Sequence, residues 1–110
     1  MQITSKDEGD TKVVVLNGKL DTNSTPTAEA EVNKLMDEGA SKVLVNFEQI
    51  SYISSSGLRF LLATAKRLKA SGGELKVCSL NEMATEVFEL SGFSAIIGVF
   101  ANEIDALGGS

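Results

Sequence analysis

The chain has 110 residues, of which 43% are hydrophobic and 23% charged, ordinary proportions for one globular domain with a core of its own. Fifteen acidic against ten basic residues give a net charge of −5, which argues against binding a nucleic-acid backbone or a membrane through a polybasic anchor. Histidine is absent, which removes the Ser-His-Asp triad, the Cys-His dyad and every histidine-containing zinc site. We therefore expect no catalytic, cofactor or metal site and predict that the protein is not an enzyme.

The number of cysteines and the length of the apolar runs indicate where in the cell the protein is expected. A single cysteine, Cys78, cannot form an intramolecular disulfide and is expected to be a small packed residue, and no leader pattern opens the chain, so a cytoplasmic location is expected. Apolar runs of a few residues fall far short of the ~20 needed to span a bilayer, so we expect no direct membrane insertion. We expect residues 1–110 to form a single domain, frayed only at Gly108–Ser110.

The first third of the chain predicts a hairpin and a helix. Residues 2–6 and 11–18 read as two strands joined by a polar turn, and the second contains the continuous apolar run Val13–Leu16 of a strand covered on both faces. Ser24 is predicted to cap a helix with Pro26 in its first turn, ending near Gly39. Its inward positions are Ala28, Val32, Leu35 and Met36.

The middle of the chain predicts a buried strand over residues 42–47 and a short extended stretch, Ile50–Ile53, before a helix that begins at three serines. Ser71-Gly72-Gly73 ends this helix. Its apolar stripe consists of Leu58, Leu61, Leu62, Ala65 and Leu68.

The last third predicts a strand over residues 74–78, a third helix, a strand over residues 96–100 and a short helix after Asn102. Ser79 and Glu82 fit a capping box at the start of the third helix. Its inward positions are Met83, Val87 and Leu90. Strands that alternate with helices indicate an α/β layer fold whose mixed sheet has an antiparallel N-terminal hairpin.

The serine cluster Ser54-Ser55-Ser56, followed by Gly57, lies between a strand and a helix, at the sheet edge where α/β proteins place their sites. One interpretation is helix capping, because serine is a standard N-cap residue. The other is modification, because a phosphate near a helix N-terminus is stabilised by exposed N–H groups, and Gly57 removes bulk that would hinder an approaching protein. A serine nucleophile is disfavoured, because the chain offers no histidine base.

The segments Leu16–Asp21, Val43–Phe47 and Ile53–Arg59, in this order and at these spacings, resemble a stand-alone STAS domain of the bacterial anti-sigma factor antagonist family. The resemblance covers almost the whole chain. It implies a mixed sheet of about five strands with an antiparallel N-terminal hairpin, three main helices and a short C-terminal helix.

The resemblance also implies a partner-switching cycle. An anti-sigma factor with serine kinase activity phosphorylates the antagonist on the residue before the glycine, here Ser56, and a serine phosphatase resets the cycle. The unphosphorylated antagonist binds the anti-sigma factor and releases the sigma factor. The family commonly has aspartate where this chain has Ser54, a departure that would slow modification or select a different partner. The residues expected to contact the partner are Asp21, Ser54, Ser55, Gly57, Leu58 and Arg59.

Three alternatives stay open at this point. Asp21 fits a turn residue as well as a site residue. The cations Arg59, Lys66 and Arg67 share one helix face, which is either a solvated face or a docking surface. The domain as a whole is either a phosphorylatable switch or a non-phosphorylated STAS scaffold of a signalling assembly or membrane transport complex, and the sequence leaves its oligomeric state open.

Overall fold

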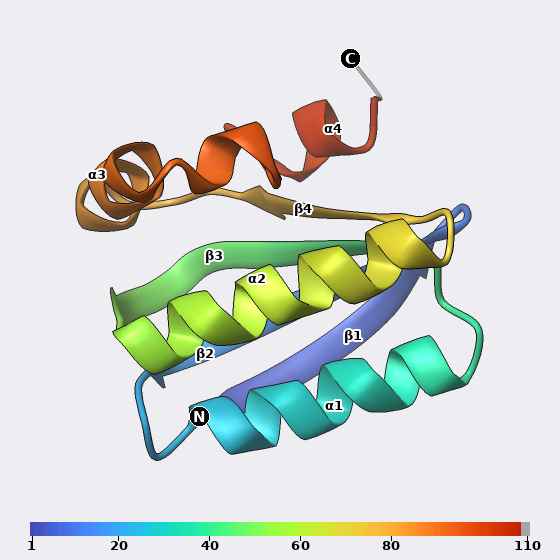
Figure 1. Ribbon diagram of the computed structural model, residues 1–110, viewed down its shortest axis with the longest axis horizontal. Coiled ribbons are helices and arrows are strands. Elements are labelled where there is room, and N and C mark those ends of the chain that lie inside the picture. Colours follow the sequence, from blue (N-terminus) through green and yellow to red (C-terminus); the bar gives the residue numbers. More distant parts are fainter. Residues whose placement is uncertain (109–110) are drawn as a thin grey trace.

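A five-stranded sheet with helices on both of its faces makes up the computed structural model, which describes residues 1–108 (Figure 1). The strands lie in the order β1-β2-β3-β4-β5; β1 and β2 are antiparallel and the other neighbours are parallel. The predicted mixed sheet, its N-terminal hairpin and its three long helices with one short one are thereby confirmed. The elements are β1 (Gln2–Glu8), β2 (Thr11–Leu20), α1 (Thr25–Asp37), β3 (Lys42–Ile53), α2 (Ser55–Ala70), β4 (Glu74–Cys78), α3 (Glu82–Ser91), a 3-10 turn (Phe93–Ala95), β5 (Gly98–Phe100) and α4 (Glu103–Ala106).

The core is divided by the sheet. Helices α1 and α2 lie side by side across one face (Figure 1), where alternate residues of β2 and β3, such as Val14 and Val45, are buried. On the other face, Val13, Leu44 and Cys78 pack with Ala106 of α4. Val13 and Val14 are therefore both fully buried on opposite faces, as the continuous apolar run predicts. Cys78 is a packed residue, as expected, and burial raises the pKa of its thiol.

The parallel pair β2 and β3 brings two distant segments to one edge of the sheet. Both strands run further than the sequence predicts, and Leu20 pairs with Ile53 at their common end. Residues 42–53 form one strand rather than a strand and a separate stretch, because register shifts in the β2–β3 ladder accommodate the irregular middle. The loop after β2 and the serines after β3 are therefore neighbours.

The predicted orientation of the third helix is wrong. Ala84 and Phe88 of α3 are buried, whereas Met83 and Leu90 are exposed and Val87 is half-buried. Phe88 is turned inward because its ring meets Phe47 of β3 edge to face, and burying a phenylalanine outweighs burying the smaller apolar residues.

The start of α3 differs from the prediction in its cap residue, and the start of α1 differs only in the side-chain bond of its cap residue. Asn81 rather than Ser79 caps α3, and its side chain accepts a hydrogen bond from the Ala84 N–H at 2.8 Å. Ser79 has a φ of 60°, and the capping box predicted with Glu82 does not form. Ser24 is the N-cap residue of α1, as predicted, but its hydroxyl makes no helix-capping bond; it donates to the carbonyl of Lys19 instead.

Two further observations concern the ends of the chain and membranes. None of the helices in residues 1–108 is long and apolar enough to cross a membrane. Gly109 and Ser110, where fraying is expected, lie outside the described residues.

Candidate partner-binding site at the start of helix α2

Ser54 ends β3 and begins α2. Its side chain accepts a hydrogen bond from the N–H of Gly57 at 3.2 Å, and its own N–H donates to the carbonyl of Leu20 at 2.9 Å. The first bond satisfies one of the helix donors that have no intrahelical partner, and the second ties the helix start to the end of β2. The capping interpretation is therefore correct for Ser54, which leaves the other two serines free of that role.

Ser56 occupies the first turn of α2 and is partly exposed. Its hydroxyl lies 3.4 Å from the Thr22 hydroxyl, in the loop after β2. Nη2 of Arg59, one turn further along α2, also donates to the Ser56 oxygen, at 3.2 Å. The Ser56 oxygen is thus reachable from solvent and lies beside a cation and a second hydroxyl.

Thr22 is a site residue that the sequence analysis did not identify. It is exposed and lies 34 positions before Ser56. Only the pairing of Leu20 with Ile53 brings the two hydroxyls together, and no local pattern in the sequence signals that register. Because parallel strands end at one edge of a sheet, the sequence can predict that the loop after β2 lies near the serines. It cannot predict which residue of that loop contacts Ser56.

Gly57 has a different role from the one expected. It is buried, and a Cβ built on it would lie 2.9 Å from Cγ of Leu20 and 3.0 Å from Cγ1 of Ile53. Its missing side chain therefore makes room for the core beneath α2 rather than opening the surface beside Ser56. The glycine places Ser56 at the surface by letting the helix start lie close to the sheet.

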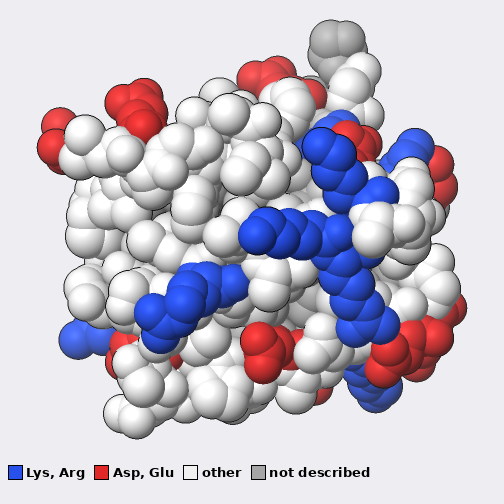
Figure 2. All heavy atoms as spheres, viewed as in Figure 1, with Lys and Arg blue, Asp and Glu red and all other residues white. Residues whose placement is uncertain are grey.

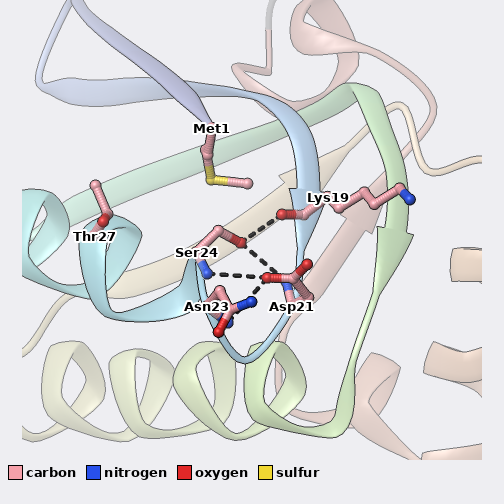
Figure 3. Close-up of a pocket in the computed structure, with 6 residues that line it drawn as sticks. All are labelled: Met1, Lys19, Asp21, Asn23, Ser24 and Thr27. Carbon is pink, nitrogen blue, oxygen red and sulfur yellow. Dashed lines mark hydrogen bonds between the residues drawn. The ribbon is translucent and has the colours of Figure 1, made fainter.

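Asp21 organises the loop that carries Thr22. Its Oδ1 accepts hydrogen bonds from the backbone N–H groups of Asn23 and Ser24, both at 3.0 Å, as Figure 3 shows. The Ser24 N–H is the main cause of a lowered pKa for the Asp21 carboxyl. The turn interpretation of Asp21 is therefore correct, and the same loop presents Thr22 to Ser56.

An open hollow of about 440 Å³ lies beside this loop (Figure 3). The Asp21 carboxylate is turned toward backbone N–H groups. The hollow does not include Ser56 or Arg59. Its lining residues are Met1, Lys19, Asp21, Asn23, Ser24 and Thr27.

The remaining expected contact residues surround Ser56. Ser55 and Arg59 are exposed and Leu58 is half-buried. Further along α2, Lys66 is exposed, whereas Arg67 pairs with Asp37 of α1 at 2.7 Å. Figure 2 shows basic side chains gathered over α2. The predicted basic face is therefore divided: Arg67 joins α2 to α1, and Arg59 lies at the serine site.

In the part of the chain that the structure describes, the Ser56 hydroxyl has no general base among its hydrogen-bond partners. Within the described chain, the Ser56 hydroxyl is hydrogen-bonded to a hydroxyl and a guanidinium, and neither is a general base at neutral pH. No cluster of acids or cysteine suited to a metal ion occurs among residues 1–108. Thr22 and Arg59 therefore do not activate the Ser56 hydroxyl as a nucleophile.

The model of the STAS domain family matches residues 2–106, so the chain belongs to this family. It is 38% identical over 94 residues to BtrV, a proposed anti-sigma factor antagonist of Bordetella bronchiseptica, covering 86% of this chain and 80% of that protein. Anti-sigma factor antagonists of the STAS family are regulatory proteins without catalytic activity, in agreement with the prediction that the chain is not an enzyme.

Solved structures give the same assignment. The anti-sigma factor antagonist SpoIIAA in its unphosphorylated form superposes with a TM-score of 0.82 at 25% identity, covering 96% of this chain and 93% of the other. The phosphorylated form of SpoIIAA, a Bacillus cell fate determinant, superposes with a TM-score of 0.77 at 25% identity and covers 97% of both chains.

Proposed function

We propose that the protein is an anti-sigma factor antagonist that is switched by phosphorylation of Ser56. Its unphosphorylated form binds an anti-sigma factor that is also a serine kinase, and the sigma factor is released. Phosphorylation at Ser56 ends this binding, and a serine phosphatase restores it. The observation that carries the proposal is the partly exposed Ser56 hydroxyl in the first turn of α2, directly before a buried glycine.

The position of Ser56 supports switching at an interface rather than by unfolding. A phosphate there would add about −1.5 to −2 charges next to the helix N-terminus and Arg59, both of which favour an anion. The domain would therefore keep its fold. A partner seated over Ser56 would meet new bulk and a charge that it must desolvate. SpoIIAA has been solved in both its unphosphorylated and its phosphorylated form, which supports a fold that is kept when a phosphate is added.

The test is to purify the protein from its native cells and determine by mass spectrometry whether a phosphoryl group is attached to Ser56. The Ser56→Ala variant should co-purify with an anti-sigma factor throughout growth, and Ser56→Asp should co-purify with less of it. Ser41→Ala and Ser41→Asp are the matched controls, because Ser41 is exposed and directly precedes β3, whereas Ser56 follows the other end of that strand. A protein without phosphate, with Ser56→Asp binding like wild type, would instead be a STAS scaffold.

We further propose that Arg59 and Lys66 attract an acidic region of that partner. They lie two helical turns apart on α2, whereas Arg67 is occupied by Asp37. The double variant Arg59→Glu and Lys66→Glu should associate with the anti-sigma factor more slowly, and the difference should shrink at high salt. Equal association rates at low salt would show that this face is only solvated.

A further inference from the structure

Helix α3 lies in a part of the chain that carries the entire excess of negative charge. All ten basic residues occur at or before Lys76, where ten acidic residues balance them. The net charge of −5 therefore comes from the residues that follow. Acidic and uncharged side chains cover the region of α3 in Figure 2, whereas basic ones lie over α2. The five unbalanced acids are Glu82, Glu86, Glu89, Glu103 and Asp105.

The outer side of α3 is also apolar. Leu90 is 81% exposed and Met83 is 36% exposed, and Val87 between them is half-buried. Their spacing of four and three residues places them in one row along the helix, as in the seam of a coiled coil. We call this row, together with Glu82, Glu86 and Glu89, the α3 face. The inward side of the helix is already filled by Ala84 and Phe88, so the row faces solvent.

The acids decide which kind of partner suits this face. Glu82, Glu86 and Glu89 follow the same spacing as the apolar row and adjoin it along the helix. If two copies of the protein packed through this face, their glutamates would be brought together, and like charges placed opposite one another cost free energy. A helix with basic residues beside its apolar row would instead gain an opposite charge at each of these positions.

We propose that the α3 face is a docking surface for an amphipathic basic helix of a partner protein. The partner helix would place apolar residues spaced by four and three positions over Met83, Val87 and Leu90, and lysine or arginine beside Glu82, Glu86 and Glu89. This surface shares no residue with the Ser56 site, so a second protein can be held while the switch operates. The proposal does not depend on phosphorylation.

The test uses a synthetic amphipathic helical peptide of leucine and lysine, with a leucine and glutamate peptide of the same pattern as its control. Titration of the isotope-labelled protein with the lysine peptide should shift the NMR amide signals of α3. Affinity should fall about tenfold in the Glu86→Lys and Glu89→Lys double variant and several-fold in Leu90→Ser. Leu90 is so exposed that its replacement should leave the fold intact, which circular dichroism checks.

The matched control for charge is the double variant Glu29→Lys and Glu31→Lys on α1, which changes net charge equally at two exposed positions. It should change affinity less than about twofold. Equal weakening by the two double variants, or no effect of Leu90→Ser, would show general attraction to an acidic protein and overturn the proposal. So would sedimentation showing a dimer of the wild type that Leu90→Ser abolishes, because the face would then be occupied by a second copy.

Discussion

Arg59 donates a hydrogen bond from Nη2 to the oxygen of Ser56 across 3.2 Å, one turn along helix α2. The sequence predicts that Arg59 contacts a partner protein. In the structure it is hydrogen-bonded to Ser56 of the same helix. A cation is therefore already in place where the proposed phosphate would be added. The Thr22 hydroxyl lies 3.4 Å from the same oxygen, so a phosphate at Ser56 would have a charged donor and a neutral donor within the domain.

The first prediction concerns the ionisation of that phosphate. Protein carrying phosphoserine at position 56 should have a second phosphate pKa lower than that of the same protein with Arg59→Gln, because the guanidinium favours the dianion. Phosphorus NMR across a pH titration measures both values. Lys66→Gln is the control, since Lys66 lies about two turns beyond Arg59 and its loss should change the phosphate pKa less. Identical pKa values with and without Arg59 would mean that the arginine turns away from a phosphorylated serine.

The second prediction concerns Ser54, where the family commonly has aspartate. Ser54→Ala should lower the free energy of unfolding by about 1 kcal/mol, because the Gly57 N–H loses its acceptor. Ser54→Asp should keep wild-type stability, since aspartate caps helices as well as serine does and its charge suits a helix N-terminus. Urea unfolding of both variants measures the difference. If Ser54→Ala and Ser54→Asp had the same free energy of unfolding as wild type, the capping bond would contribute little to stability.

The third prediction concerns Gly57. Gly57→Ala should lower the free energy of unfolding by about 1–3 kcal/mol, because the new Cβ would lie 2.9 Å from Cγ of Leu20 and force the core under α2 to shift. Urea unfolding measures the loss. Ser55→Ala, at the exposed neighbouring helix position, is the control and should change stability by less than about 0.5 kcal/mol. Wild-type stability of Gly57→Ala would show that Leu20 and Ile53 give way without cost.

Local sequence patterns predict the strands, helices and sheet type of this protein because each element carries its own periodicity or cap. They fail at α3, where a row of apolar residues, Met83, Val87 and Leu90, is as regular as the row that is buried. Only the position of Phe47 on β3 decides that Phe88 faces inward. The site shows the same division: Ser54 and Ser56 follow from the local motif, whereas Thr22 requires the register of two strands.

The last prediction concerns the link between α4 and the sheet. Glu103 accepts a hydrogen bond from Nδ2 of the buried Asn46 at 2.5 Å and pairs with Lys6 of β1 at 3.0 Å. The Asn46 bond, followed by the Lys6 interactions, lowers the pKa of the Glu103 carboxyl. A carboxyl whose pKa is lower in the folded than in the unfolded state stabilises the fold above its unfolded pKa. That stability is lost as the pH falls through the folded pKa.

Glu103→Gln should therefore lower the free energy of unfolding at neutral pH by about 1 kcal/mol, because glutamine keeps an acceptor for Asn46 but loses the charge that strengthens this bond. The loss should shrink as the pH falls below about 4, because the wild-type carboxyl then becomes protonated and, like the glutamine amide, carries no charge. Urea unfolding at several pH values measures this, with Asp105→Asn, an exposed acid of the same helix, as the control for charge. Equal stability of wild type and Glu103→Gln from neutral to acid pH would show that the carboxylate charge is not what holds α4 to Asn46. The neutral amide, which offers Asn46 the same acceptor, would then be sufficient.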